Sequence, residues 1–326
     1  MLQLGIARLL LAALLALAAW PAAAQDNYPS RPITLILPYA AGGGTDAIAR
    51  VLAKTLEAKL GGAIVVENRP GAGGNMATDA VAAAPPDGYT LMIGNQGPMV
   101  VTPHLFKAMK SDPEKTLEPI GLVAEAALVV VVGPRLPVTS LDGLIKAAKA
   151  KSGDLTYASA SNASASHLAA LLLERAAGFK ARHVAYRGAG PALNDLVGGH
   201  VDFMITTIPS VTGLIESGKV TALAVTGATR AEALPKVPTA AEAGLDGYTA
   251  STWYGLLAPK GLPAALGRRI EAALTAALDD PTLRQRLKDD GAKPSRLRGS
   301  AFAAFMREER KRWGDVIRDA GISLKE

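Results

Sequence analysis

The chain has 326 residues, of which 49% are hydrophobic and 20% charged, which is enough apolar material for one large or two ordinary domains. It has no cysteine, so no disulfide framework supports the fold. The net charge is +6. Basic residues are densest at 307–312, where glutamates interrupt them in an amphipathic helix pattern. Such a pattern is typical of a solvated helix face, and we expect no nucleic-acid partner.

The first 25 residues have the features of a secretory signal peptide. Arg8 precedes the apolar run Leu9–Trp20, and small residues follow it. This pattern predicts cleavage near Ala24 or Gln25. The apolar run is short for a bilayer, and no later stretch is long enough to span one. We therefore expect an exported, soluble protein with a periplasmic location.

A strand, a glycine loop and a helix are predicted in succession near the start of the mature chain. Ile33–Leu37 is an apolar run of strand length, and three glycines follow at 42–44. Apolar positions then recur at helical spacing from Ile48, with Thr45 or Asp46 as the N-cap. Backbone N–H groups at such a helix start can point at an anion.

Strands and helices alternate along most of the chain. This alternation predicts an α/β fold with mainly parallel sheets in two lobes, and the C-terminal part is expected to rejoin the first lobe. Strands are expected at 33–37, 63–67, 89–94, 122–132, 155–159, 181–185, 201–206, 220–226 and 252–258. Helices are expected at 76–84, 141–151, 166–177, 191–197, 266–279, 281–291 and 300–320. The run at 122–132 exceeds the usual strand length, which suggests that it passes through one sheet towards a second.

Loops rich in glycine or serine follow four of the predicted strands. They are 39–44, 95–97, 159–166 and 186–191, and Thr45, Ser166 and Pro191 are start signals for the helices after them. Each loop alone could be an ordinary tight turn. In open α/β sheets, however, ligands bind at the carboxyl ends of strands. Four such loops in two lobes therefore favour a ligand cleft, in which backbone N–H groups and hydroxyls can hold a carboxylate without arginine.

A dinucleotide site is one alternative. Gly42, Gly44 and Ala47 match the G-x-G-x-x-G/A fingerprint, and Glu67 lies at a suitable distance for a ribose-binding acid. Residues 38–41 separate the strand from the glycines, whereas the dinucleotide turn follows its strand directly. An exported protein also meets little nicotinamide cofactor, so we expect no cofactor.

A secreted hydrolase is another alternative. Serines crowd residues 159–167, but no G-x-S-x-G sequence is present, and N-capping explains Ser166 beside His167. The four histidines show neither an H-E-x-x-H sequence nor a cysteine–histidine pattern. The sequence thus favours non-covalent capture over catalysis, and no metal site is expected.

Many sequence motifs occur in a fixed order. They include Pro38-Tyr-Ala-Ala-Gly-Gly-Gly-Thr-Asp46, Val66-Glu-Asn-Arg-Pro-Gly-Ala-Gly-Gly74, Pro86-Asp-Gly-Tyr-Thr-Leu91, Tyr186-Arg-Gly-Ala-Gly-Pro-Ala192, Gly198-Gly-His-Val-Asp202 and Trp253-Tyr-Gly-Leu-Leu-Ala-Pro259. In these motifs, from Tyr28 to Leu324, the chain resembles the periplasmic substrate-binding proteins of tripartite tricarboxylate transporters, the Bug family.

The resemblance implies a bilobal periplasmic-binding-protein fold of type II-like organisation. Lobe 1 would comprise residues 26–130 and 248–326, and lobe 2 residues 131–247, with hinge strands near Val132 and Thr252. The partners it implies are a small organic acid or amino acid ligand and membrane permease subunits, with the receptor a monomer. A ligand-presenting co-receptor for a membrane sensor kinase is the alternative role.

The resemblance also implies a set of ligand-binding residues in the loops of both lobes. In lobe 1 these are Tyr39, Ala40, Gly43, Gly44, Asn95 and Gln96, and in lobe 2 they are Ser159, Asn162, Ser164, Ser166, Tyr186 and Asp202. The chain departs from the family where Ala158, Ser161 and Ala163 replace common glycines. A Cβ atom at those positions restricts the backbone. We expect it to keep the ligand farther away, so that ligand size or chemistry differs from that of the best-known binders.

Overall fold

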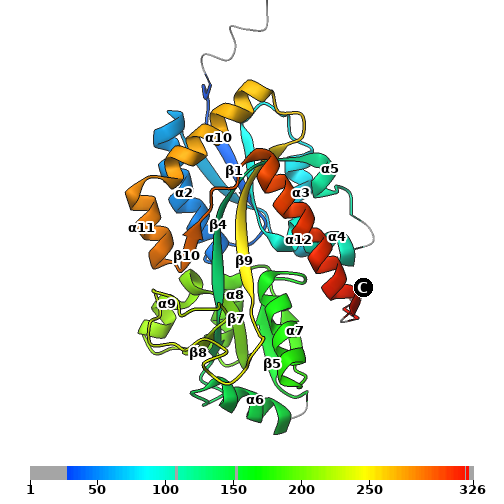
Figure 1. Cartoon of the computed structure of the whole chain (residues 1–326), viewed down its shortest axis with the longest axis vertical. Helices are drawn as coiled ribbons and strands as arrows, with labels where there is room; N and C mark the ends of the chain where they lie inside the picture. Colours follow the sequence, from blue (N-terminus) through cyan, green and yellow to red (C-terminus); the bar gives the residue numbers. More distant parts are fainter. Residues whose placement is uncertain (1–27, 107–108, 151–152, 320, 323–326) are drawn as a thin grey trace, which may run out of the picture.

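The chain forms two α/β lobes stacked end to end (Figure 1). The computed structural model describes residues 28–106, 109–150, 153–319 and 321–322, so the predicted signal peptide at 1–25 lies outside them. The strands order as β2-β1-β3-β9-β4-β7-β5-β6, with β10 and β8 also paired to β4. The predicted bilobal α/β fold is therefore confirmed, but the sheets are mixed and not mainly parallel, because β4 and β9 pair antiparallel with their neighbours. No helix of the described residues is long and apolar enough to cross a membrane.

The upper lobe of Figure 1 has a sheet covered by helices on both faces. Its strands are β1 (Ile33–Leu37), β2 (Ile64–Asn68), β3 (Thr90–Gly94), β9 (Ser251–Pro259), β10 (Ala292–Pro294) and the first part of β4 (Leu117–Val132). One face carries α2 (Gly44–Leu60), α10 (Ala264–Leu278) and α11 (Pro281–Asp289), and the other α3 (Asn75–Ala82) and α12 (Gly299–Asp319). Short helical turns are η1 (Ala72–Gly74), η2 (Gly97–Val101), α4 (Thr102–Leu105) and α5 (Pro113–Thr116).

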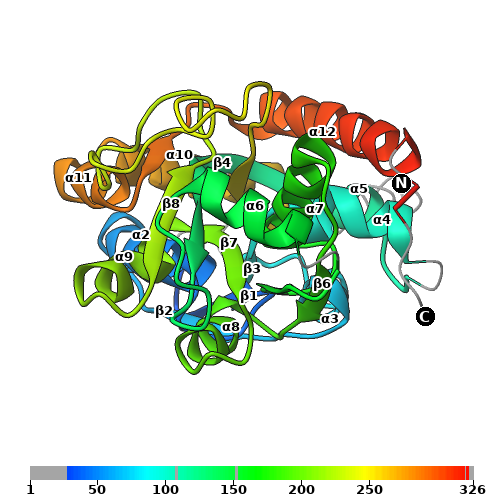
Figure 2. The same ribbon diagram turned by 90° about the horizontal axis from the view of Figure 1, so that it is seen from below.

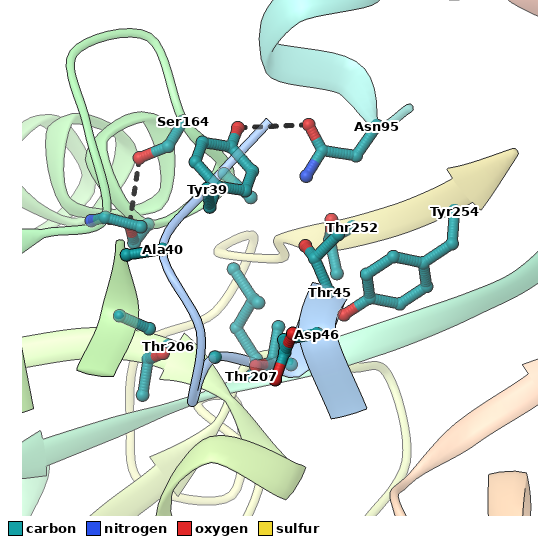
Figure 3. Close-up of a pocket in the computed structure, with 17 residues that line it drawn as sticks. Tyr39, Ala40, Thr45, Asp46, Asn95, Ser164, Thr206, Thr207, Thr252 and Tyr254 are labelled. Atoms are coloured by element: carbon teal, nitrogen blue, oxygen red, sulfur yellow. Dashed lines mark hydrogen bonds between the residues drawn. The ribbon is translucent and has the colours of Figure 1, made fainter. Parts of the chain in front are cut away.

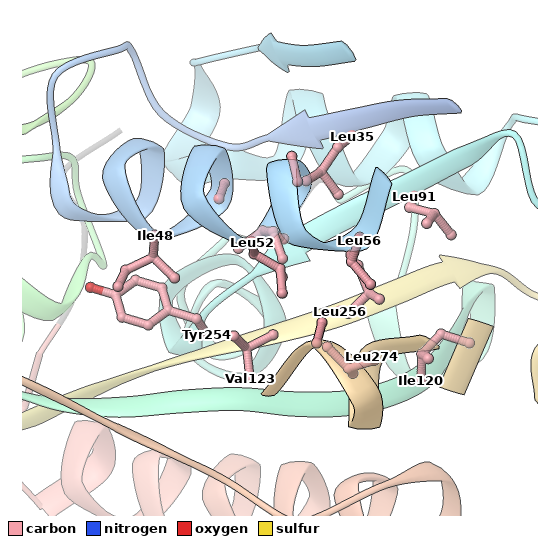
Figure 4. Packing of buried hydrophobic residues seen from close by; sticks show 14 of the residues in the cluster. Leu35, Ile48, Leu52, Leu56, Leu91, Ile120, Val123, Tyr254, Leu256 and Leu274 are labelled. Atoms are coloured by element: carbon pink, nitrogen blue, oxygen red, sulfur yellow. The ribbon is translucent and has the colours of Figure 1, made fainter. Parts of the chain in front are cut away.

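The core of the upper lobe shows why α2 forms where it does. Ile48, Leu52 and Leu56 recur every four residues, so they share one helix face, and all three are fully buried. They pack in one cluster with Leu35 of β1 and Leu274 of α10 (Figure 4). Burying each such side chain contributes about 1.5–3 kcal/mol. Helix α10, from the C-terminal part of the chain, thereby packs against α2 and β1 from the N-terminal part. This packing fixes the start of α2 at the lobe boundary.

The lower lobe repeats this layered arrangement, as the view from below shows (Figure 2). Its strands are β5 (Thr156–Ser159), β6 (Arg182–Ala185), β7 (Phe203–Thr207), β8 (Thr221–Val225) and the last part of β4. One face carries α6 (Leu141–Ala150) and α7 (Ala165–Ala177), and the other α8 (Ala189–Val197) and α9 (Ile208–Glu216). β5, β6 and β7 are parallel, so their carboxyl ends share one edge of the sheet.

The strand β4 belongs to both lobes, as its length suggested. It pairs with β9 as far as Ala127 and with β7 from Leu128 onward. The crossing between lobes therefore lies at residues 127–128. Val132, where a hinge was predicted, pairs instead with Phe203 inside the lower lobe. Val132 lies inside the lower lobe because β4 continues for five residues beyond the crossing.

Three helix starts differ from those predicted. Helix α2 begins at Gly44 with Gly43 as its N-cap, so Thr45 and Asp46 lie in the first turn. Helix α7 is capped by Ser164 and not by Ser166, and α8 begins at Ala189, ahead of Pro191. Helix α9 and strand β10 were not predicted, because Pro209 and Pro294 read locally as breakers.

Candidate functional site

A small cavity lies where the two lobes meet beside the crossing strands (Figure 3). Its volume is about 40 Å³. Seven of the sequence-predicted residues line it: Tyr39, Ala40, Gly43, Gly44, Asn95, Ser164 and Ser166. The structure therefore brings the glycine loop of one lobe and the serine loop of the other to a common space.

The start of α2 forms one wall of the cavity. Its N-cap, Gly43, has no side chain to accept a hydrogen bond from the first turn. The first N–H groups of a helix have no intrahelical acceptor, and here they belong to buried residues, Gly44, Thr45 and Asp46. Uncapped N–H groups and the positive end of the helix dipole favour an anion at this place.

Asp46 is the charged side chain of the cavity wall, and it is already neutralised. Its carboxylate accepts hydrogen bonds from Arg50 Nε (3.0 Å), Gly42 N–H (3.2 Å) and Asn68 Nδ2 (3.1 Å). Burial alone would raise the pKa of Asp46, but these hydrogen bonds outweigh it and hold the pKa below its usual value. Asp46 thus stays ionised and holds the glycine loop in place.

The start of α7 forms the opposite wall, and there serine hydroxyls bond to their own loop. Ser164 Oγ caps α7 by accepting from His167 N–H and also donates to the carbonyl of Ser161 (2.7 Å). Ser166 Oγ accepts from Ala160 N–H (2.9 Å). These hydroxyls are largely used to hold the loop, so the helix start itself faces the cavity.

Two more helices of the lower lobe begin at the cavity. Ala189 is the first residue of α8 and Thr207 the N-cap of α9, and neither helix has a side-chain cap. Four helix N-termini therefore converge on one small space: α2, α7, α8 and α9. Among the residues that the structure describes, no lysine or arginine lines it.

The two lobes touch across the cavity, which shows a closed arrangement. Ala40 N–H donates to the carbonyl of Arg187 in the other lobe (2.8 Å). Gly44 lies so close to Thr207 that a Cβ atom on the glycine would be 2.1 Å from Thr207 Oγ1. Closure thus depends on a backbone without a side chain at Gly44.

Tyr39 and Asn95 are linked at the upper edge of the cavity. The hydroxyl of Tyr39 donates to Asn95 Oδ1 (3.1 Å). Burial raises the pKa of Tyr39 to about 12, although hydrogen bonds with Asn95 and Ser161 oppose the rise. The phenol is therefore a neutral donor, and it orients the Asn95 amide at the cavity.

The structure places five other predicted residues outside the cavity lining, where their groups support neighbouring backbone. They are Gln96, Ser159, Asn162, Tyr186 and Asp202. The Gln96 amide donates to the Ser251 carbonyl (2.7 Å) and accepts from Trp253 N–H (3.2 Å). Asp202 accepts from the backbone N–H and hydroxyl of Thr156 (2.7 and 2.9 Å).

The other three residues of this group lie in the lower lobe. Ser159 Oγ donates to the Ser161 carbonyl and lies 2.6 Å from His183 Nε2. Tyr186 donates to the carboxylate of Asp195, and Asn162 is only partly buried. Ser159 and Tyr186 thus bond to groups of their own lobe in this closed arrangement.

The replaced family glycines also lie away from the cavity. None of Ala158, Ser161 and Ala163 lines it. Ala163 instead adopts a left-handed backbone with a φ of 62° and donates its N–H to His167 Nδ1 (3.1 Å). Their Cβ atoms therefore do not set the width of the cavity wall.

Ten lining residues were not in the predicted site. Four lie outside the glycine- and serine-rich loops: Leu128, Thr206, Thr252 and Tyr254. Ala160, Ala165 and Ala189 lie within the predicted loops 159–166 and 186–191 but were not selected as single residues. Thr45, Asp46 and Thr207 lie next to elements that the sequence did identify. Thr206 and Thr207 end β7, so the rule that ligands bind at strand carboxyl ends could have found them. Within the described part of the chain, no group of three or more His, Asp or Glu side chains could hold a metal ion.

Comparisons with known proteins identify the family. The family model of the tripartite tricarboxylate transporter family receptor, TctC, matches residues 48–322. BugT of Bordetella pertussis is 38% identical over 304 residues, covering 92% of both chains. The structure of the periplasmic binding protein BugD superposes with a TM-score of 0.87 at 36% identity, covering 91% of this chain and all of that one.

A third relative carries a ligand. The structure of MatC from Rhodopseudomonas palustris with bound malate has a TM-score of 0.84 at 35% identity, covering 89% of this chain and all of that chain. Family match, chain-length similarity and fold all agree. The chain therefore belongs to the tripartite tricarboxylate transporter receptor family, the Bug-type solute-binding receptors.

Proposed function

We propose that the protein is a periplasmic receptor that closes its two lobes on a small carboxylate and delivers it to a tripartite tricarboxylate-type permease. The observation that carries this proposal is the meeting of four helix N-termini at one cavity without lysine or arginine. Such an arrangement supplies partial positive charge and N–H donors to an anion. The malate bound to MatC is a ligand of this class.

The closed arrangement also bears on how the ligand enters. A cavity of about 40 Å³ is too small for a whole organic acid, because a cavity that holds a benzene molecule has a volume of roughly 150 Å³. The lobes must therefore separate for entry and rest slightly farther apart around the ligand. Hinge closure of this kind is known for periplasmic binding proteins. The close approaches of Ala40 and Gly44 to the lower lobe would loosen as the cleft opens.

Isothermal titration of the purified mature protein against mono-, di- and tricarboxylates and amino acids tests the proposal. We expect binding of at least one carboxylate, with the ligand recovered unchanged after incubation. Failure to bind any of them would overturn the carboxylate receptor. Recovery of a chemically altered ligand would favour the hydrolase instead.

The transport partner needs a separate experiment. Tagged receptor would be incubated with solubilised membranes of the source cells, with and without the ligand found by titration. Permease subunits enriched by ligand would support delivery for transport. Enrichment of a sensor kinase in their place would assign the co-receptor role.

A further inference from the structure

The cavity contains a buried hydroxyl that no group of the described chain satisfies. Tyr254, on β9, is only 1% exposed, and its hydroxyl has no hydrogen-bond partner among the described residues. Leaving a buried polar group unpaired is costly, and native structures contain few such groups. Tyr254 belongs to the cavity lining, and its fully buried hydroxyl points from β9 towards the first turn of α2, where Thr45 and Asp46 lie (Figure 3).

Among the described residues, no neighbour of Tyr254 supplies an acceptor in good hydrogen-bond geometry. Thr207 Oγ1, which pairs with Ser210 Oγ (2.6 Å), lies close enough to lower the pKa of the phenol but is not placed to accept from it. The ring of Tyr254 packs beside Ile48 in the core, which fixes its direction (Figure 4). Burial raises the pKa of Tyr254 strongly, Thr207 opposes the rise, and Asp290 and Tyr39 add to it. The phenol is thus a neutral, oriented donor without an acceptor.

The charges near Tyr254 indicate what kind of acceptor suits it. Asp46 is ionised and lies in the same cavity wall. Asp290 is close enough that its charge raises the pKa of the phenol. Both carboxylates are paired with arginines, Asp46 with Arg50 and Asp290 with Arg286 (3.3 Å). Because the uncapped helix starts already offer N–H groups to the carboxylate of the ligand, the neutral phenol suits a second, neutral oxygen of the same molecule.

We propose that the Tyr254 hydroxyl donates a hydrogen bond to a neutral oxygen on the carbon chain of the ligand, a hydroxyl or keto group, while the helix N-termini hold its carboxylate. Tyr254 is then the residue that selects hydroxy and keto acids over unsubstituted acids of the same length. This inference rests on the carboxylate-receptor function proposed above and assigns it a substrate class.

The test uses matched pairs of acids that differ by one hydroxyl. Succinate and malate, glutarate and 2-hydroxyglutarate, and propionate and lactate would be titrated calorimetrically into the wild-type protein and the Tyr254→Phe variant. In at least one pair we expect the wild type to prefer the hydroxy acid by about tenfold, the worth of one hydrogen bond. Tyr254→Phe should abolish this preference and leave the affinity for the unsubstituted acid within about twofold.

Tyr248→Phe is the matched control, because the hydroxyl of Tyr248 is buried outside the cavity and already donates to the Ala169 carbonyl (3.0 Å). We expect Tyr248→Phe to lower the unfolding midpoint and keep the hydroxy-acid preference. Tyr254→Phe should not lower the midpoint of the ligand-free protein, since among the described residues the phenol makes no hydrogen bond that the substitution would remove.

The outcomes separate the two proposals. If the wild type binds acids without a hydroxy preference, or if Tyr254→Phe weakens both members of a pair equally or neither, the role of Tyr254 is overturned while the receptor function stands. If the wild type binds none of the paired acids nor any keto acid of the same lengths, the proposed substrate class is overturned. Failure of the full carboxylate panel overturns the receptor function as well.

Discussion

The two walls of the cleft start their helices in different ways. Helix α2 begins behind Gly43 without any side-chain cap, whereas α7 begins behind Ser164, which caps it and bonds to the preceding loop. Both helices direct their positive ends at the same cavity. The upper wall thus offers bare N–H groups, and the lower wall offers a loop stabilised by its own hydroxyls.

This difference indicates which wall binds the carboxylate and which wall is rigid before the ligand arrives. An uncapped helix start gains its missing partners from the ligand, so it suits a group common to all ligands, the carboxylate. A self-bonded loop is rigid before the ligand arrives, which reduces the entropy lost on binding. Changes on the upper wall should therefore affect binding most, and changes on the lower wall should affect stability first.

Gly44→Val should have the largest effect, on the upper wall. Its Cβ would lie 2.1 Å from Thr207 Oγ1, so the lobes could not close, and we expect no measurable binding by titration calorimetry. Gly43→Val should also abolish binding, because its Cβ would lie 3.2 Å from that of Ala189. Circular dichroism should show both variants folded. Gly213→Ala is the control, because a Cβ atom there would meet nothing within 4 Å, and it should bind like the wild type. Wild-type affinity in Gly44→Val would contradict the proposed site.

Acid should weaken the lower wall. His167 and His183 stack with ring centres 4.0 Å apart beneath the serine loop, and burial lowers the pKa of His167 to about 3 and that of His183 to about 4, from 6.5. A second cause for His167 is the neighbouring His183. Because the folded pKa values lie below the unfolded ones, stability is fully present above pH 6.5 and falls as the pH drops towards 4. The loss is at most about 1.4 kcal/mol per pH unit for each histidine.

Urea unfolding at several pH values between 7 and 4 measures this loss. A His167→Gln, His183→Gln double variant should have a flatter profile over the same range. An unchanged profile in that variant would show that other groups cause the acid sensitivity.

Ser164→Ala should have a smaller effect. Loss of an N-cap costs about 1 kcal/mol of unfolding free energy, and the variant also loses the bond to the Ser161 carbonyl. We expect the affinity to fall less than in Gly44→Val, because the N–H groups of α7 remain. Ser140→Ala removes a hydroxyl that accepts from Gly143 N–H at the start of α6, away from the cavity. It should lose stability without losing affinity, and equal loss of affinity in both would refute a local role for Ser164.

Ala163→Gly should have the smallest effect, and in the opposite direction. Ala163 has a φ of 62°, which an alanine adopts at a cost of about 1 kcal/mol that glycine avoids. Part of this gain is offset because glycine makes the unfolded chain more flexible. We expect a gain of up to about 0.5 kcal/mol in urea unfolding. Ala158→Gly, in a buried strand, should instead destabilise the protein, and a loss in both variants would contradict strain at Ala163.

The sequence predicts much of the fold because the local signals are strong there. The apolar run Ile33–Leu37 became β1 with the predicted bounds, and the unusual length of the run ending at Val132 indicated a strand shared by two sheets. The helix α9 was missed because Pro209 and Gly213 look like breakers, although Pro209 occupies a first-turn position that helices tolerate.

The candidate site was predictable only in part, since loop composition shows where a cleft lies but not which way a side chain points. Gln96 follows the correct strand, yet its amide is used by residues 251 and 253, about 155 positions away in the chain. Tyr254 lies in a strand with no local sign of ligand binding. Its importance depends on the absence of an acceptor, which only the three-dimensional arrangement reveals.

Thr226 has a consequence for protein engineering. Its hydroxyl accepts from Leu128 N–H (2.8 Å) and donates to the Ala250 carbonyl (2.6 Å), so the two points where the chain leaves and re-enters the upper lobe are held side by side. Residues 128–250 therefore form one continuous segment with adjacent ends. Exchanging this segment for that of a relative would replace one half of the cleft in a single cloning step and keep the anion-binding start of α2 unchanged.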